Sequence, residues 1–234
     1  IPNHDEIFND GLGNKLHIEL FKPFVLENFN DLNVQVIDQD RPVVSEGGFH
    51  FNEGLFNKCP DWVCLSGYFQ TERYFKNIEQ EIREDFRFKD EILEPCKEMM
   101  DDFGEPPLSL HIRRGDFLIN SGNHHNLDLD YYDKALAEFP TSVPVLIFSD
   151  DPEWCGEQEI FGDDRFLIAE GNSSYVDLCL MSLCEGHIIA NSTFSWWGAW
   201  LADSKMVVAP SVWFGPNNAH LDIKDLYLDH WEII

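Results

Sequence analysis

Two adjacent arginines are the strongest chemical signal in the sequence. Arg113 and Arg114 stand in the stretch HIRRGDF, and Asp116 follows two positions after Arg114. Guanidinium groups donate pairs of parallel hydrogen bonds, a geometry that suits phosphate oxygens. The apolar run PLSLHI comes directly before them and predicts a buried strand. We therefore expect the arginines at the carboxyl end of a strand, where open α/β sheets bind ligands. The alternative is a solvated pair, with one arginine bonded to Asp116.

A second stretch, NSTFSWWGAWL, places the hydroxyls of Ser192, Thr193 and Ser195 where a strand is expected to turn into a helix. The free N–H groups and the dipole of a helix N-terminus attract anions. The alternative is an ordinary helix cap followed by a tryptophan-rich core face. Two anion-suited elements at the carboxyl ends of strands in one sheet favour a shared diphosphate.

Regular alternation of strands and helices begins near residue 106. Expected strands are 107–112, 143–151, 165–169, 187–191 and 205–210, and expected helices are 131–139, 152–161, 172–185 and 192–202. Asp130 and Asp151 are predicted helix caps, Ser174 and Asp177 form a capping pattern, Gly186 is a helix stop, and residues 113–126 are a loop. This alternation predicts a parallel, doubly wound sheet.

The amino-terminal part has a weaker pattern. Residues 1–65 contain short apolar pieces, LHIELF and NVQVID, but no complete β-α-β unit, and EGGFHFNEG predicts a loop or hairpin. An amphipathic helix is expected over residues 75–88. We predict an incomplete amino-terminal, acceptor-side part over residues 1–100 and a Rossmann-like domain over residues 101–234.

Composition limits the partners. The chain has 43 acidic and 16 basic residues, a formal net charge of −27, and this field argues against nucleic acid or an anionic membrane surface. The six cysteines lack the paired spacing of a zinc site and are expected mainly as reduced core residues. No apolar run approaches the roughly 20 residues that span a bilayer, and no signal peptide is visible.

Several segments together resemble one enzyme family. GYFQTERYF, HIRRGDF, FSDDPEWC and DLCLMSLCEGHIIANSTFSWWGAWL, with APSVWF and the terminal DHWEII, are similar to the bacterial-type α-1,2-fucosyltransferases from about Gly67 onward. The resemblance implies a GT-B-like fold with a Rossmann-like GDP-fucose-binding domain and a small or truncated amino-terminal part. It implies inverting transfer of L-fucose from GDP-fucose to a galactose-terminated glycan in α-1,2 linkage, with no metal or other cofactor. Alternatives are another linkage and a non-catalytic GDP-sugar-binding remnant.

The resemblance also implies a donor site. Arg113 and Arg114 would hold the diphosphate and stabilise the charge that grows on GDP, with the turn after the later strand sharing that work. The donor-binding set is His111, Arg113, Arg114, Ser149, Asp150, Asp177, Asn191, Ser192, Thr193, Phe194, Ser195 and Trp196.

Several of these roles have a structural alternative. Asp177 would accept from guanine or serve only the helix cap with Ser174, and His111 would orient an arginine or the donor or be structural. Asp116 is the nearest candidate for a base, or it only positions an arginine. Ser149, Asp150 and Asp151 close the next strand and would touch ribose or base, although helix capping explains Asp151 without any ligand. Trp196 and its tryptophan neighbours are core and donor-pocket wall.

Two further expectations concern the rest of the chain. The loop before residue 130, with His124 and His125, is expected to face the acceptor. The family begins with a strand and a G-G-L-G-N-Q turn, whereas DGLGNKLHIELF at residues 10–21 has Lys15 in place of Gln and lies too close to Gly67. We therefore expect the first β-α unit to be absent. A bacterial-type member would be cytoplasmic, with any membrane association supplied by segments outside this chain or by a partner.

Overall fold

A computed structural model describes residues 7–9, 15–17, 22–26 and 41–234 of the chain. The chain divides into two compact units, Ile1–Ile92 and Leu93–Ile234, and each is described by itself. The division falls within helix α3 (Asp90–Asp101). The assignment of acceptor and donor sides to residues 1–100 and 101–234 stays a prediction. The glycine-containing stretch of residues 10–14 and the apolar residues 18–21 and 33–38 lie outside the described residues.

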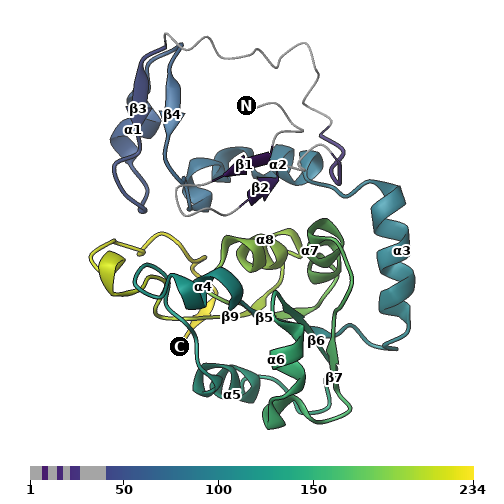
Figure 1. The fold of residues 1–234 in the computed structure, drawn as a ribbon. Coiled ribbons are helices and arrows are strands. Elements are labelled where there is room, and N and C mark those ends of the chain that lie inside the picture. Colours follow the sequence, from purple (N-terminus) through teal and green to yellow (C-terminus); the bar gives the residue numbers. More distant parts are fainter. Residues whose placement is uncertain (1–6, 10–14, 18–21, 27–40) are drawn as a thin grey trace. The chain divides into compact units, whose positions relative to one another are not determined.

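The second unit is built on one parallel sheet of six strands, and this confirms the predicted α/β class (Figure 1). The spatial order is β10-β9-β8-β5-β6-β7, and every neighbouring pair is parallel. The strands are β5 (Leu108–Ile112), β6 (Val145–Ser149), β7 (Phe166–Ile168), β8 (Gly186–Ile188), β9 (Met206–Ala209) and β10 (Glu232–Ile233). Counted along the chain from β5, this order is the 3-2-1-4-5-6 arrangement of doubly wound nucleotide-binding folds.

Helices cover both faces of this sheet. Figure 1 shows α7 and α8 on one face and α5 and α6 on the other. The helices of this unit beyond α3 are α4 (Gly115–Ile119), α5 (Leu129–Ala137), α6 (Pro152–Gly156), α7 (Ser174–Ser182) and α8 (Thr193–Leu201), with short 3₁₀ turns at Glu159–Phe161 and Pro216–Asn218. In the part of the chain that the structure describes, no helix is long and apolar enough to cross a membrane.

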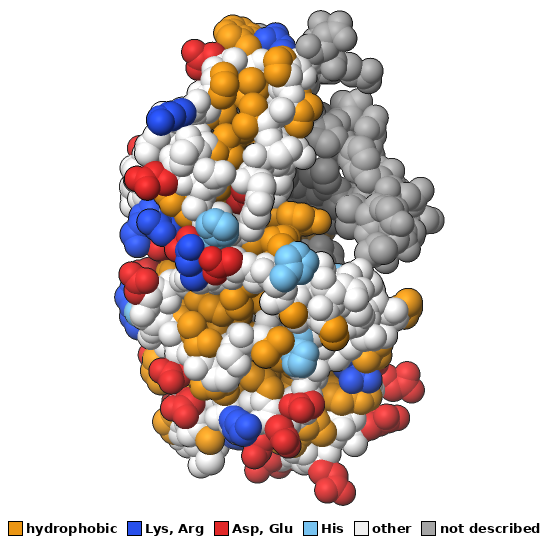
Figure 2. Space-filling view, turned by 90° about the vertical axis from the view of Figure 1, so that its left-hand side faces the viewer, with side chains coloured by type: hydrophobic (Ala, Val, Ile, Leu, Met, Phe, Trp, Pro, Cys, Tyr) orange, Lys and Arg blue, Asp and Glu red, His pale blue; other side chains and the backbone are white. Residues whose placement is uncertain are grey.

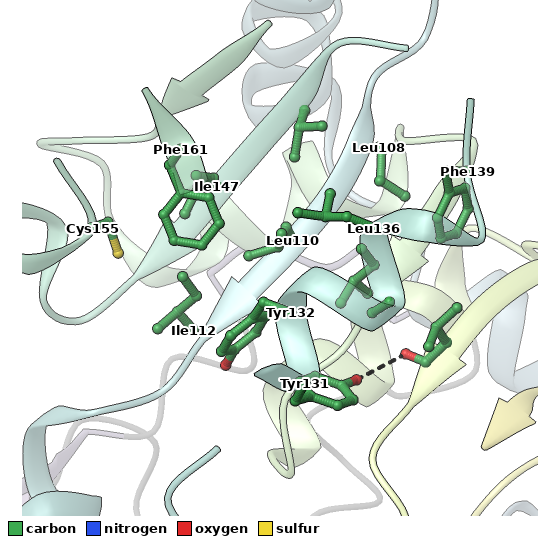
Figure 3. Packing of buried hydrophobic residues seen from close by; sticks show 14 residues of the cluster. Leu108, Leu110, Ile112, Tyr131, Tyr132, Leu136, Phe139, Ile147, Cys155 and Phe161 are labelled. Carbon is green, nitrogen blue, oxygen red and sulfur yellow. Dashed lines mark hydrogen bonds between the residues drawn. The ribbon is translucent and has the colours of Figure 1, made fainter. Parts of the chain in front are cut away.

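Alternation along β5 divides its side chains between the two faces. Leu108, Leu110 and Ile112 pack with Tyr132 of α5 in the main hydrophobic core (Figure 3). The hydroxyl of Tyr131 donates to the carbonyl of Ile189 at 2.7 Å and lies 3.4 Å from that of Val208. Side chains of β5 at odd positions face the opposite side of the sheet, since successive strand residues alternate. The sheet therefore places His111 on the side of α8.

Several predicted helix boundaries were wrong for local reasons. Asp128, not Asp130, caps α5, because its Oδ1 accepts from the N–H of Tyr131 at 3.1 Å. The N-cap of α7 is Ser173, which makes no side-chain cap bond, and Asp177 instead accepts from Asn172.

Three further segments also differ from the prediction. Gly186 begins β8 and does not end the helix, which stops at Ser182. Residues 115–119 form the short helix α4 inside the segment that was expected to be a loop through Asn126. The helix expected over 152–161 is divided into α6 and a 3₁₀ turn. Asp151 is confirmed as a cap, since its Oδ1 accepts from the N–H of Trp154 at 3.3 Å.

Four of the six cysteines are buried thiols, as predicted, and all six are free. They are Cys96, Cys155, Cys179 and Cys184, whereas Cys59 is exposed and Cys64 half-buried.

The first unit holds two small sheets. Strands β1 (Ile7–Asn9) and β2 (Lys15–His17) pair antiparallel, and β3 (Val43–Ser45) and β4 (Cys64–Ser66) pair parallel. Its helices are α1 (Glu53–Lys58) and α2 (Glu79–Asp85), with 3₁₀ turns at Glu72–Tyr74 and Lys76–Ile78. The helix expected over 75–88 is thus interrupted near its start. Figure 2 shows hydrophobic side chains gathered on the surface of this unit.

A buried carboxylate joins two stretches of the first unit. Glu46 is only 2% exposed, and its Oε2 accepts from the N–H groups of Tyr68 and Phe69, each at 2.9 Å. A Cβ at Gly67 would lie 2.5 Å from the Cβ of Glu46. A glycine is therefore required where GYFQTERYF approaches EGGFHFNEG.

Candidate functional site

The centre of the second unit's sheet is the point where the strand order reverses. β5 pairs with β6 on one side and with β8 on the other, so the chain changes direction across the sheet between β5 and β8. In open α/β sheets this switch point, at the carboxyl ends of the strands, is where ligands bind. The predicted site residues from HIRRGDF and NSTFSW come from the two strands that flank it.

One hydrogen bond connects these two motifs across the switch point. The Nδ1 of His111 lies 2.9 Å from the Oγ of Ser195, and both residues are buried. Burial, reinforced by the charge of Arg113, lowers the pKa of His111 to about 3. His111 is therefore neutral at physiological pH, and it fixes the first turn of α8 against β5.

The turn into α8 is held by its own hydroxyls. Ser192 is the N-cap, and its Oγ accepts from the N–H of Phe194 at 3.3 Å. Thr193 is exposed at the first position of the helix. The nine-residue helix thus presents a capped N-terminus at the switch point, as the anion-site hypothesis requires.

The side-chain amide of Asn191 is not available to donate a hydrogen bond to a phosphate. Its side chain is 3% exposed, and its Nδ2 donates to the carbonyl of His125 at 2.9 Å and to that of Trp213 at 2.7 Å. An amide nitrogen carries two hydrogens, so both are engaged by the protein. Asn191 connects the loop before α5 to the loop after β9.

The two arginines are surrounded by carboxylates. Arg113 pairs with Asp116 and, at 3.1 Å, with Asp150, while the Nε of Arg114 pairs with Asp151 at 3.0 Å. The bond between one arginine and Asp116 is present as the alternative expected, neither arginine is fully solvated, and diphosphate binding by the pair stays a prediction. Their side chains are 34% and 21% exposed.

The Arg114 guanidinium is held on two sides. Its carbon lies 3.7 Å from the ring centroid of Trp154, and its Nε donates to Asp151. In the described residues no partner is found for its two amino groups. These groups are the donors of the pair best placed to serve an anion.

Asp150 organises the turn after the arginines. Its Oδ1 accepts from the backbone N–H of Arg114 at 2.8 Å, and its Oδ2 faces Arg113. A Cβ at Gly115 would lie 2.6 Å from that Oδ2. The glycine of HIRRGDF is therefore explained by the close approach of Asp150.

The other predicted residues have protein partners as well. Ser149 accepts from the N–H of Asp151 at 3.0 Å, and Asp177 accepts from Asn172 at 2.9 Å. Burial raises the pKa of Asp177, although the hydrogen bond from Asn172 opposes this shift. Trp196 is buried, and its indole N–H donates to the carbonyl of Leu226 at 2.8 Å, so it belongs to the core side of α8.

Sequence reasoning missed two residues that hold Arg114. Asp151 was considered as a cap or as a contact to ribose or base, but not as a partner of Arg114, and Trp154 was not considered, although both stand in FSDDPEWC. The doubled Asp was the available signal, since two carboxylates facing two arginines suggest two ion pairs. No group of three metal-ligating side chains occurs within the ranges that the structure describes.

Comparison with known proteins gives the site its context. A family model described as Glycosyl transferase family 11 matches residues 47–234. An alpha-1,2-colitosyltransferase of Escherichia coli is 40% identical over 164 residues, covering 65% of this chain and 56% of that protein. Galactoside alpha-(1,2)-fucosyltransferase 1 of Sus scrofa is 24% identical over 162 residues, covering 60% of this chain and 43% of that protein. The chain thus matches about half of the length of these relatives.

A solved structure of NodZ alpha-1,6-fucosyltransferase soaked with GDP-fucose superposes with a TM-score of 0.49 at 15% identity, covering 72% of this chain and 61% of that chain. The predicted family resemblance is confirmed by the family model, whose match over residues 47–234 covers the arginine motif, the switch point and the whole parallel sheet. The chain belongs to glycosyltransferase family 11.

Proposed function

We propose that this chain carries the donor-binding part of an inverting transferase that moves L-fucose from GDP-fucose to a galactose-terminated glycan in α-1,2 linkage. The observation that carries the proposal is the meeting of HIRRGDF and the capped N-terminus of α8 at the switch point, joined by the bond between His111 and Ser195. Two anion-suited elements at this position match a sugar diphosphate.

Electrostatic stabilisation of the leaving group is the proposed source of catalysis. As the C–O bond to GDP breaks, negative charge grows on the diphosphate, and preorganised donors aimed at that charge lower the barrier. The amino groups of Arg114 and the free N–H groups at the start of α8 supply such donors. The reaction proposed here uses no metal, because the arginine and the helix N-terminus take the place of a cation.

Asp116 is better suited to positioning than to proton transfer. Its Oδ1 is bonded to the Arg113 guanidinium, which also pairs with Asp150. A carboxylate bonded in this way holds the arginine in place. Since GDP is a good leaving group, the proposed reaction does not depend on a strong base in this unit.

Colitose is the second candidate donor sugar. The relative with 40% identity is described as an alpha-1,2-colitosyltransferase, a higher identity than the 24% to the porcine fucosyltransferase. The residues proposed above face the nucleotide part of a donor and do not discriminate between the two sugars.

A donor panel tests the proposal. GDP release is measured from GDP-fucose and from GDP-colitose, each with and without lactose, and the product linkage is determined by NMR. Lactose-stimulated release from GDP-fucose with an α-1,2 product supports the proposal, and preference for colitose supports the second candidate. A different linkage would correct the regiochemistry. Binding of GDP without any release would identify a non-catalytic remnant.

A further inference from the structure

A hollow of about 230 Å³ lies in the second unit beside the carboxyl end of β9. Its walls come from the first turn of α5, the residues before it, and the loop that follows β9. We infer that this hollow binds a single neutral sugar unit, the terminal galactose of the acceptor glycan. The inference rests on the proposed function, which it deepens by placing the acceptor.

The lining combines hydrogen-bonding groups with apolar surface. Asp128, Asp130 and Lys134 provide charged groups, while Leu127 and Val212 provide apolar contact. A pyranose has both characters, since its hydroxyls donate and accept and its C–H face is apolar. The chemistry of the lining therefore fits a sugar.

Charge and size exclude the nucleotide part of the donor. Two carboxylates and one ammonium give this lining a negative balance, which disfavours a phosphate. The volume is also below the roughly 300–1,000 Å³ of pockets that take larger ligands. A neutral monosaccharide unit agrees with both limits.

The charged groups on α5 are available to a ligand. Asp130 and Lys134 are four positions apart on one helix face, yet no ion pair between them is found in the described residues. Asp128 uses its Oδ1 to cap the helix, which leaves its second oxygen. Carboxylate oxygens and an ammonium can thus meet hydroxyls on different sides of a sugar ring.

The two loops that continue into the walls of the hollow are bonded to each other a few residues away from its lining. The N–H of Gly215 donates to the carbonyl of Asn123 at 2.9 Å, and that of Asn217 to Gly122 at 2.8 Å. A Cβ at Gly215 would lie 2.6 Å from the carbonyl oxygen of Ser121, so this close pairing requires glycine.

The same walls are tied to the donor motif. The Asn191 amide donates to His125 on one side and to Trp213 on the other, and Asn191 directly precedes the Ser192 cap of α8. The floor is fixed by Tyr131, whose hydroxyl donates to the carbonyl of Ile189 between β8 and the same motif. These bonds connect both walls of the hollow to the residue that precedes the α8 cap, and on this link the inference places the acceptor close to the proposed donor site.

Saturation-transfer NMR and calorimetry with lactose test the inference on the whole chain with GDP present. Val212→Trp fills the hollow from a side chain that is 45% exposed, and Asp130→Asn removes one charge from its wall. Asp133→Asn is the matched control, since Asp133 is exposed on the same helix but does not line the hollow.

We expect the lactose Kd to rise at least tenfold in Val212→Trp and about tenfold in Asp130→Asn, the loss of a hydrogen bond to a charged group. Asp133→Asn should leave it unchanged, and the GDP Kd should stay within twofold in all three. An unchanged lactose Kd in both hollow variants, an equal effect of Asp133→Asn, or no lactose binding by the unmodified protein overturns the inference. Lactose binding in the hollow without GDP release from any donor would instead refute the proposed function alone.

Discussion

The two arginines differ in how firmly the protein holds them. The Arg113 side chain is shared between Asp116 and Asp150, whereas the Arg114 side chain, among the described residues, is bonded only through Nε and lies over the ring of Trp154. The stacking and the Nε bond fix the plane of the Arg114 guanidinium. Its amino groups therefore have a fixed direction but are not hydrogen-bonded to any described residue, which is the arrangement expected of a preorganised donor.

Arg114→Lys should therefore reduce turnover far more than stability. A lysine keeps the charge but loses both the fork and the planar stacking, so we expect kcat to fall on the order of 10²-fold. Arg165→Lys is the control, because Arg165 also lies over an aromatic ring, that of Phe166, but at the edge strand β7. GDP-release kinetics and thermal melting of both variants give the comparison. Turnover near that of the unmodified protein would remove Arg114 from the donor site.

Asp177 allows a test of nucleotide recognition. The cap hypothesis has lost its support, since Asp177 accepts from Asn172 and does not serve the N-terminus of α7. If its carboxylate accepts from guanine, Asp177→Asn should weaken GDP binding by about 1–3 kcal/mol, because an amide donor would face a donor. Calorimetry with GDP on the folded variant measures this. Asn172→Ala is the companion variant, and equal losses in the two would show that only the local hydrogen bond matters.

Two buried histidines predict acid sensitivity. Burial lowers the pKa of both His111 and His187 to about 3, with the Arg113 charge adding to the shift of His111 and a backbone hydrogen bond at Cys184 opposing that of His187. An unfolded histidine titrates near 6.5. Their neutral forms thus contribute full stability above about pH 6.5, and this is lost as the pH falls from 6.5 towards 3.

Urea unfolding at several pH values checks this expectation. Each histidine should add a slope of about 1.4 kcal/mol per pH unit within that window. His187→Gln and His111→Gln should each remove one such slope. A variant that folds and keeps the slope of the unmodified protein would show that its histidine is protonated in the native state.

At the scale of elements, the contact between α7 and α8 depends on one glycine. A Cβ at Gly198 would lie 2.8 Å from the Cβ and 3.0 Å from the sulfur of Met181. Gly198→Ala should therefore lower the free energy of unfolding by about 1–3 kcal/mol through overpacking, although alanine favours helix.

Gly156 supplies the control within the same unit. A Cβ there would meet only the Cδ1 of Ile168, at 3.8 Å, which is an ordinary contact. Gly156→Ala at the end of α6 should be neutral or stabilise by about 0.5–1 kcal/mol. Denaturant unfolding compares the two, and equal effects would contradict the overpacking explanation.

The elements that sequence patterns predicted well are the buried ones. Five strands with continuous apolar runs were expected close to where β5 to β9 lie, because burial on both faces leaves an unmistakable composition. The missed β10 has two residues and exists only through its pairing with β9. No local pattern specifies so short an edge strand.

The candidate site could be predicted by position but not by contact. HIRRGDF and NSTFSW were assigned to strand ends. Their spacing does not show that His111 contacts Ser195, or that the side-chain amide of Asn191 donates to the carbonyls of His125 and Trp213. Such contacts depend on which strands become neighbours. The order of β8 beside β5 is set by the whole sheet and not by either motif.

At the scale of the molecule, charge opposes the proposed donor. The chain carries a net charge of −27, and the arginines themselves sit among three carboxylates (Asp116, Asp150 and Asp151). Acidic side chains are visible on the surface of both units in Figure 2. An anionic donor should be repelled at a distance and attracted only at contact.

Moderate salt should therefore raise kcat/KM for GDP-fucose before higher salt lowers it. The Debye length falls from about 30 Å at 0.01 M to about 8 Å at 0.15 M, which screens the distant repulsion more than the short contacts at the switch point. A titration of initial rates with salt, at constant pH, should show a maximum. A steady fall from the first addition would mean that the arginines dominate already at encounter distance.

The position of the switch point also has a consequence for synthesis of the chain. Of the six strands of this sheet, β5, β6 and β7 are synthesised first. The second edge of β5 then has no partner until β8 begins at Gly186. An unpaired edge of an apolar strand is a template for other chains, and pairing between strands so distant in sequence is slow. A nascent chain that stalls before Gly186 exposes this edge of β5. The switch point, where the donor is proposed to bind, is therefore also the place where the growing polypeptide is most exposed to aggregation.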